Sequence, residues 1–122
     1  MAVELYVPVT RRRSNLMRLP DPIQTYFEAQ SPQNKDTLAA AFTPDAVVRD
    51  EGNIHRGPDD IRRWWREAKQ KYRHHAEPLD VAEAAGKTVV RARVSGDFPG
   101  SPAILSFTFR LAGDRIAELE IG

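Results

Sequence analysis

The sequence contains no cysteine among its 122 residues. This absence excludes disulfide bonds, catalysis by a thiolate, and zinc or iron–sulfur sites built on cysteine. Two of the three histidines, His74 and His75, are adjacent. In a strand they would point to opposite faces and could not bind one ion together. We therefore expect packing alone to hold the fold, and we expect no metal and no cofactor.

The sequence also lacks long hydrophobic runs and an excess of either charge. No apolar run approaches the roughly 20 residues of a membrane-spanning helix, and the N-terminus has no apolar signal segment. Lysine and arginine total 18, against 17 for aspartate and glutamate. This balance gives no reason to expect a nucleic-acid or membrane partner. A cytoplasmic protein is the expectation.

Residues 1–19 are predicted to form an N-terminal arm. Apolar and other residues alternate from Val3 to Val7, but Pro8 interrupts the pattern and Arg11–Arg13 follow. Two interpretations remain open: an edge strand added to a partner subunit, or a solvated tail carrying a charge cluster. Residues 20–122 then fit one domain of ordinary size.

Two short helices are predicted at the start of this domain. Asp21-Pro22 is a helix-start signal, because aspartate can cap free N–H groups and proline fits the first helical turn. The first helix ends at Ser31-Pro32. The second begins near Asn34, carries a small apolar stripe that includes Phe42, and ends at Thr43-Pro44-Asp45.

A short strand with a carboxylate follows, and then the strongest helix signal of the chain. Residues 46–50 are rich in β-branched side chains and end at Asp50. If Val48 faces the core, the period of two sends Asp50 inward, where burial would raise its pKa; the opposite register would leave it in water. After a turn containing His55, Gly57-Pro58 opens a helix with an apolar stripe. The stripe comprises Ile61, Trp64, Trp65, Ala68 and Tyr72.

The remainder of the chain predicts about four antiparallel strands. They are expected near residues 74–83, 88–94, 103–111 and 117–121, and Pro78 indicates an edge strand or a bulge in the first of them. Helices followed by a sheet make an α+β domain in which the helices cover one face of the sheet. A curved sheet around a long helix leaves an open end suited to a small-molecule pocket.

The phrases FTPDAVVRDEG, HRGPDDIRRWW and GDFPGSPAILSFTFRLAGDRIAELEIG resemble the nuclear-transport-factor-2-like superfamily, in its SnoaL-like and ketosteroid-isomerase-like branch. The resemblance covers residues 20–122. It implies a cystatin-like α+β roll: a cone-shaped, strongly curved antiparallel sheet wrapped around a long helix, with two shorter N-terminal helices. Proteins of this superfamily include isomerases, dehydratases, cyclases, epoxide hydrolases and proteins without catalysis.

The resemblance also suggests site residues. Asp50 matches the general base of ketosteroid isomerases, and Tyr26 matches the tyrosine that donates a hydrogen bond to the developing oxyanion. The isomerase pattern places a protonated acid on a later strand, but the matching stretch, Leu105 to Phe109, contains none. Steroid isomerisation itself is therefore not predicted. Candidate ligand contacts are Trp64, Trp65, Phe107 and Phe109, each with packing as the alternative role. His55 is a further candidate, at the rim of the pocket, and its alternative is a loop position without a role in binding.

Two functions remain open. The first is a cofactor-independent isomerase, cyclase or lyase-type enzyme that binds a small hydrophobic carbonyl compound, with Asp50 as proton acceptor and Tyr26 as donor. The second is a non-catalytic module that binds a hydrophobic ligand or only dimerises. A homodimer through the sheet is expected, since Ile104, Ser106 and Thr108 lie on the strand face opposite Phe107.

Overall fold

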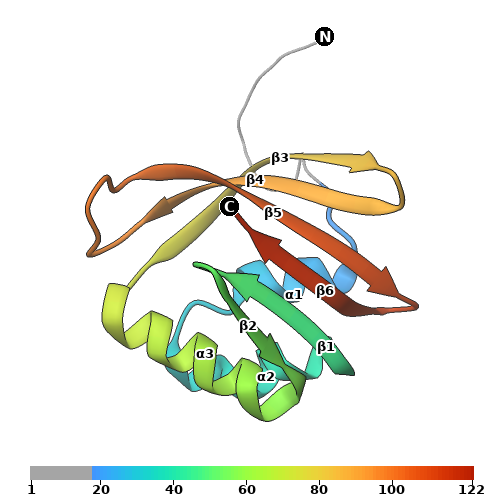
Figure 1. Cartoon of the computed structure of the whole chain (residues 1–122). Coiled ribbons are helices and arrows are strands. Elements are labelled where there is room, and N and C mark those ends of the chain that lie inside the picture. Colours follow the sequence, from blue (N-terminus) through green and yellow to red (C-terminus); the bar gives the residue numbers. More distant parts are fainter. Residues whose placement is uncertain (1–17) are drawn as a thin grey trace, which may run out of the picture.

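The computed structural model describes residues 18–122, in which three α-helices lie against the concave side of a curved six-stranded sheet (Figure 1). This arrangement confirms the predicted α+β roll. Most of the predicted N-terminal arm, including Arg11–Arg13 and its strand-like start, lies outside the described residues.

Two short helices precede the sheet, as predicted. Helix α1 (Asp21–Glu28) has Pro22 in its first turn and buries Ile23, Tyr26 and Phe27. A single 3₁₀ turn (Pro32–Asn34) then leads into α2 (Lys35–Ala40). A capping box fixes the start of the turn: the Ser31 hydroxyl accepts from the backbone N–H of Gln33, and the Asn34 side chain accepts from the N–H of Ser31.

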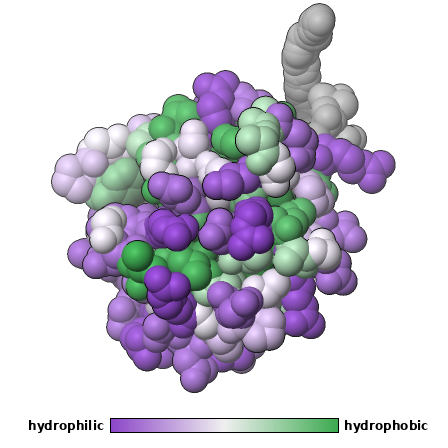
Figure 2. All heavy atoms as spheres, turned by 45° about the vertical axis from the view of Figure 1, so that its right-hand side comes forward, coloured by the Kyte–Doolittle hydropathy of each residue, from purple (hydrophilic) through white to green (hydrophobic). Residues whose placement is uncertain are grey.

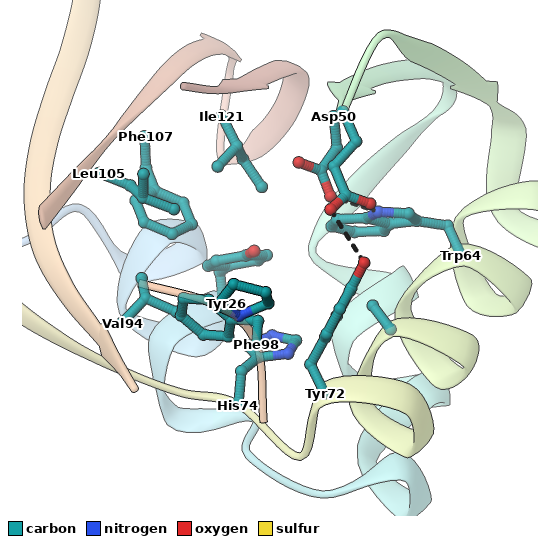
Figure 3. A pocket seen from close by; sticks show the side chains of 13 residues that line it. Tyr26, Asp50, Trp64, Tyr72, His74, Val94, Phe98, Leu105, Phe107 and Ile121 are labelled. Atoms are coloured by element: carbon teal, nitrogen blue, oxygen red, sulfur yellow. Dashed lines mark hydrogen bonds between the residues drawn. The ribbon is translucent and has the colours of Figure 1, made fainter. Parts of the chain in front are cut away.

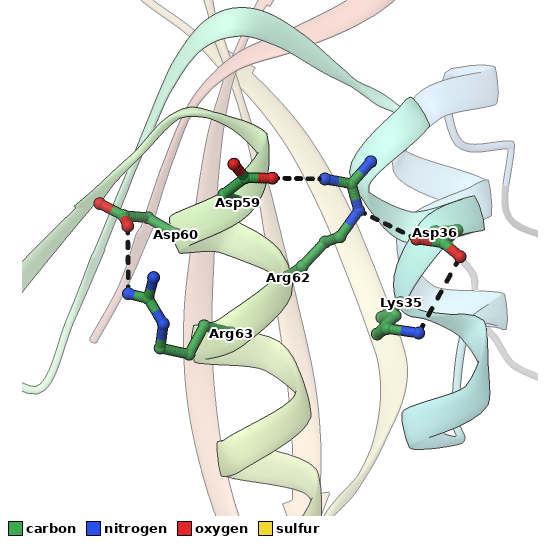
Figure 4. Close-up of polar contacts among 6 residues, drawn as sticks. All are labelled: Lys35, Asp36, Asp59, Asp60, Arg62 and Arg63. Carbon is green, nitrogen blue, oxygen red and sulfur yellow. Dashed lines mark hydrogen bonds and ion pairs between the residues drawn. The ribbon is translucent and has the colours of Figure 1, made fainter.

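Helix α3 (Gly57–Tyr72) is the long helix that the apolar stripe predicts. Ile61, Trp64 and Trp65 are buried against the sheet and the other helices. On the outer side of α3, Arg62 pairs with Asp59 of its own helix and with Asp36 of α2, while Arg63 pairs with Asp60 (Figure 4). Because these ion pairs are exposed, they add little stability, and the buried stripe holds the helix in place.

The strands occur in the order β2-β1-β6-β5-β4-β3 across the sheet. Strands β3 to β6 form the predicted antiparallel meander, whereas β1 pairs in parallel with β6 and antiparallel with β2. The edge strand β3 shifts register between Pro78 and Asp80, which confirms the bulge or edge predicted from the proline. The bounds are β1 Phe42–Asp50, β2 Asn53–Arg56, β3 His75–Ala84, β4 Lys87–Ser95, β5 Ala103–Ala112 and β6 Arg115–Ile121.

The structure corrects the sequence analysis around β1. Phe42 belongs to the strand and pairs with Ile116 of β6, so residues 43–45 do not close a helix. The register of β1 on β6 shifts between Phe42 and Val47, and this irregularity accommodates Pro44, which has no N–H to donate. The predicted turn after Asp50 is also shorter than expected: only Glu51 and Gly52 turn, and residues 53–56 form β2.

The hydrophobic core fills the space between the helices and the concave face of the sheet. Its fully buried members include Ile23, Leu38, Val48, Phe109 and Leu119. On the face in Figure 2, hydrophobic residues occur in small groups separated by hydrophilic ones. Among residues 18–122, no helix is both long enough and apolar enough to span a bilayer.

Candidate functional site

A cavity of about 350 Å³ opens between α3, the end of β1 and the concave face of the sheet (Figure 3). One side carries polar groups and the other is apolar. The lining comprises Tyr26, Asp50, Glu51, Trp64, Ala68, Tyr72, His74, Val94, Phe98, Pro99, Leu105, Phe107 and Ile121. Helix, sheet and the β4–β5 loop all contribute, so the site depends on the complete fold.

Asp50 reaches this cavity because of the register of β1. Ala46 and Val48 are fully buried, and the strand period turns Asp50 to the same inner side, where it is half-buried. Burial raises the pKa of Asp50 above its ordinary value, and the Trp64 indole N–H, which donates to Oδ2 at 3.0 Å, partly opposes this rise. The structure therefore selects the inward register of the two considered from the sequence.

Tyr26 extends from α1 into the same cavity. Its ring is 6% exposed and packs edge-on against Phe27 and Phe109, with centroids 5.1 and 5.6 Å away. The hydroxyl points into the cavity (Figure 3) and makes no hydrogen bond to any side chain or backbone group of residues 18–122. Burial, assisted by the charge of Asp50, raises the pKa of Tyr26, so the hydroxyl stays a donor at all ordinary pH values.

Glu51 and Tyr72 form a second polar contact that the sequence analysis did not predict. The Tyr72 hydroxyl donates to Oε2 of Glu51 at 3.1 Å and joins the end of α3 to the turn after β1. Glu51 has φ 53° and Gly52 has φ 78°, which is the conformation of a two-residue hairpin turn. Two features of the sequence could have indicated this contact: Glu51 directly follows Asp50, and Tyr72 lies on the apolar stripe of the helix.

His74 lines the bottom of the cavity, just before β3. Burial and the neighbouring Lys69 lower the pKa of His74 to about 4, so its imidazole is neutral near pH 7. The Lys69 ammonium donates to the backbone carbonyl of His74 at 2.8 Å and to Oε1 of Gln30 at 3.3 Å. His75 is exposed, so the two adjacent histidines have different surroundings.

The structure brings four of the sequence-predicted site residues together: Asp50, Tyr26, Trp64 and Phe107 all line the cavity. Three others lie elsewhere. Trp65 packs in the core under Lys69, Phe109 is fully buried, and His55 borders an adjacent groove of about 190 Å³ while its ring lies 5.8 Å from that of Trp64.

The sheet wall of the cavity is apolar. Strand β5 contributes Leu105 and Phe107, and Ile121 from β6 completes this side. No carboxylic acid stands on β5 where the isomerase resemblance would place a second donor. Within the described part of the chain, no group of three histidine, aspartate or glutamate side chains is placed to hold a metal ion.

A model of the SnoaL-like domain matches residues 23–119. The chain belongs to the SnoaL-like domain family. This finding confirms the resemblance stated from the sequence. No match was found among curated proteins.

Solved structures of similar fold support this assignment. A provisionally assigned polyketide cyclase from Sinorhizobium meliloti is 48% identical, with a TM-score of 0.80 over 85% of this chain and 95% of that one. An uncharacterised cystatin-fold protein from Novosphingobium aromaticivorans is 20% identical, with a TM-score of 0.67 over 84% and 95%. A Catenulispora acidiphila protein with a ketosteroid-isomerase-like fold, solved with trimethylamine, is 18% identical, with a TM-score of 0.71 over 86% of both chains. The last two show the fold alone.

Proposed function

We propose that this SnoaL-like domain binds a small hydrophobic carbonyl compound in its cavity and that Asp50 removes a proton from the carbon next to the carbonyl. The observation that carries the proposal is the placement of Asp50, a carboxylate with a raised pKa at the polar edge of an otherwise apolar cavity. A carboxylate whose pKa is raised toward neutrality is a better proton acceptor than a fully solvated aspartate.

The proposed step transfers the proton to a carboxylate oxygen of Asp50. Oδ2 already accepts from Trp64, so Oδ1 is the oxygen available to receive the proton. The electron pair of the broken C–H bond moves onto the carbonyl and forms an enolate. The return of the proton to another carbon would complete an isomerisation. Alternatively, attack of the enolate carbon on a second carbonyl of the same molecule would form a ring and an alkoxide, and the proton held by Asp50 would pass to that alkoxide to complete a cyclisation.

Tyr26 is the proposed donor to the enolate oxygen. Its buried hydroxyl points into the cavity without a partner in residues 18–122, and buried hydroxyls normally have one. A ligand oxygen would supply that partner and gain stabilisation as negative charge develops on it. The match to a provisionally assigned polyketide cyclase at 48% identity agrees with chemistry of this class.

Deuterium exchange tests the proposal without knowledge of the natural substrate. 2-Tetralone is a small hydrophobic ketone with acidic α-protons, and NMR in D₂O follows their loss. The protein should accelerate the exchange, and Asp50→Asn should reduce the acceleration by about 10²-fold or more. Tyr26→Phe should reduce it by about 10-fold to 10³-fold.

Asp45→Asn is the matched control, because Asp45 lies on the exposed part of the same strand. It should exchange 2-tetralone at the parent rate. Equal rates for Asp50→Asn and the parent would refute the role of Asp50.

Ligand binding without catalysis is the second candidate function. The missing acid on β5 favours it, since a single donor stabilises an enolate less than two do. Binding of 2-tetralone, seen as a shift of the Trp64 indole NMR signal, with no accelerated exchange by the parent protein would support this function over the first.

A homodimer through the outer face of the sheet is part of the proposal. On this face Ile104 of β5 is 50% exposed and Leu79 of β3 is 36% exposed, and ion pairs such as Arg93 with Glu77 surround them. Light scattering should give twice the monomer mass of 13.8 kDa, and Ile104→Glu should return the protein to a monomer. A monomer mass for the parent would refute the dimer. A cytoplasmic location stays a prediction from the sequence.

A further inference from the structure

The charged groups that line the cavity are all acidic. Asp50 and Glu51 are its two carboxylates, and His74, whose pKa is about 4, adds no positive charge near pH 7. Neither carboxylate pairs with a lysine or arginine of residues 18–122. The cavity is therefore a region of negative potential in a protein whose formal net charge is +1.

Aromatic rings make up much of the remaining wall. Trp64 and Tyr72 reach the acidic end of the cavity through their hydrogen bonds to Asp50 and Glu51, and Phe98 lies next to Tyr72. Tyr26 and Phe107 line the opposite side (Figure 3). Tyr72 and Phe98 meet edge to face, with centroids 6.1 Å apart and an interplanar angle of 87°. Ring faces attract cations, and this attraction strengthens where water is excluded.

From this combination we infer that the ligand of the cavity carries a cationic amine, held by the carboxylate of Glu51 and the rings of Trp64, Tyr72 and Phe98. The inference rests on the proposed function, because it names the substrate class for the same cavity. Glu51 and Tyr72 are linked by their hydrogen bond, so the carboxylate is held at a fixed place beside the rings.

The two ends of the cavity then bind different parts of one molecule. The amine lies toward the Glu51–Tyr72 contact, and the carbonyl lies toward Asp50 and the free hydroxyl of Tyr26. That hydroxyl belongs to a residue that is only 6% exposed and has no partner in residues 18–122, so it supports a hydrogen-bonding ligand at the inner end. The substrate class is a hydrophobic carbonyl compound with a protonated or quaternary amine.

Lys71 lies near the aromatic rings of the cavity but on the outer side of Tyr72. Lys71 places its ammonium 5.0 Å from the centroid of Tyr72, which shows that this ring already accepts a cation on a face. Lys71 borders the adjacent groove together with Glu67 and does not line the cavity. Its exposed charge is screened by water and salt, whereas a charge inside the cavity is screened less.

Three probes of nearly the same shape test the inference. Phenyltrimethylammonium is cationic, tert-butylbenzene is its neutral isostere and benzenesulfonate is an anion with the same tetrahedral outline. Titration followed by the indole NMR signals should shift Trp64, while Trp65, which lies outside the cavity, serves as an internal reference. The cation should bind at least about tenfold more tightly than the neutral probe, and the anion should bind more weakly than either.

A matched pair of variants assigns the effect to Glu51. Glu51→Gln keeps the side-chain shape, and it should weaken binding of the cation about tenfold while tert-butylbenzene changes by less than about twofold. Glu120→Gln removes a carboxylate from the exposed side of β6 and should change neither affinity. The comparison of the three probes on the parent protein needs no variant, so it decides the question even if Glu51→Gln folds poorly.

The outcomes separate this inference from the proposed function. Equal or tighter binding of tert-butylbenzene than of the cation overturns the cationic ligand, while exchange of 2-tetralone would still support Asp50 as a base. Failure of all three probes to bind also overturns the inference. Failure of the probes together with absent exchange overturns both proposals.

Discussion

The indole N–H of Trp64 donates a 3.0 Å hydrogen bond to Oδ2 of Asp50. This contact joins the middle of α3 to the last residue of β1, fourteen positions earlier in the chain. It fixes one carboxylate oxygen of Asp50 against the helix. It also favours the charged form of Asp50 and so limits the rise in pKa that burial causes.

Trp64→Phe should raise the pKa of Asp50 further, because the hydrogen bond to the carboxylate is lost while the ring remains. The same change should cost about 1–3 kcal/mol of unfolding free energy. NMR titration of the Asp50 side-chain carboxyl carbon measures the first effect and urea denaturation the second. Trp65→Phe is the control: it also removes a buried indole, but the pKa of Asp50 should stay as in the parent. A lower pKa in Trp64→Phe would contradict this account.

Because the pKa of Asp50 is raised in the folded state, its contribution to the free energy of unfolding should fall as the pH rises. Asp50 has a pKa above 3.8 in the folded state, so the folded protein holds this proton more tightly than the unfolded chain does. Its contribution is most favourable below 3.8 and is lost as the pH rises through the folded pKa. Urea denaturation between pH 4 and 8 should therefore show the parent losing stability relative to Asp50→Asn, with Asp45→Asn as control. A difference that moves the other way would count against burial as the dominant cause.

Lys69 should produce the opposite slope at alkaline pH. Burial lowers its pKa from 10.5 to about 8, so the folded state binds this proton less tightly than the unfolded chain. The parent should gain stability relative to Lys69→Met as the pH rises from about 8 toward 10.5. Urea denaturation over this range measures the gain, and Lys71→Met, at an exposed lysine of the same helix, is the control. A flat difference for Lys69→Met would show that its ammonium is better solvated than its 4% exposure indicates.

Gly96→Ala should distort the backbone at Tyr72 and His74, two residues that line the cavity. A methyl group at this position would lie 2.7 Å from the backbone oxygen of Tyr72 and 2.9 Å from Cα of His74. Backbone must move to relieve these contacts, at a cost of roughly 1–3 kcal/mol. Because the loop after Gly96 carries Phe98, the variant should also bind 2-tetralone more weakly. Calorimetry and NMR titration measure both effects, and both should be absent in Ser95→Ala, at the exposed neighbouring position. Parent-like binding by Gly96→Ala would show that the loop adjusts independently of the cavity.

Most of the fold could be predicted from the sequence because its local signals agree. Proline and aspartate mark the starts of α1 and α3, and alternation of apolar residues marks β4 and β5. The early part of β1 could not be found in this way. Pro44 is an ending signal in isolation, and only pairing with β6, which lies some seventy residues later, makes a strand there.

The site was partly predictable. Spacing and family resemblance indicated Asp50 and Tyr26, and the structure places both on one cavity. The contributions of Glu51, Tyr72 and His74 depend on how the end of α3 packs beside a two-residue turn, which no local pattern encodes. Periodicity likewise could not distinguish Phe107, which lines the cavity, from Phe109, which is buried two residues later on the same face.

Asp50 and Glu51 are adjacent in sequence but differ in backbone conformation, since Asp50 ends a strand and Glu51 begins a turn. Asp50 is the last residue of β1 and pairs with Asn53 of β2, whereas Glu51 occupies a turn position with φ 53°, where asparagine or glycine would be less strained. Mutation at position 51 could therefore change which ligands are accepted while the neighbouring acid keeps its place. The charge at the mouth of the cavity can thus be altered at one turn residue without disturbing the strand that positions Asp50.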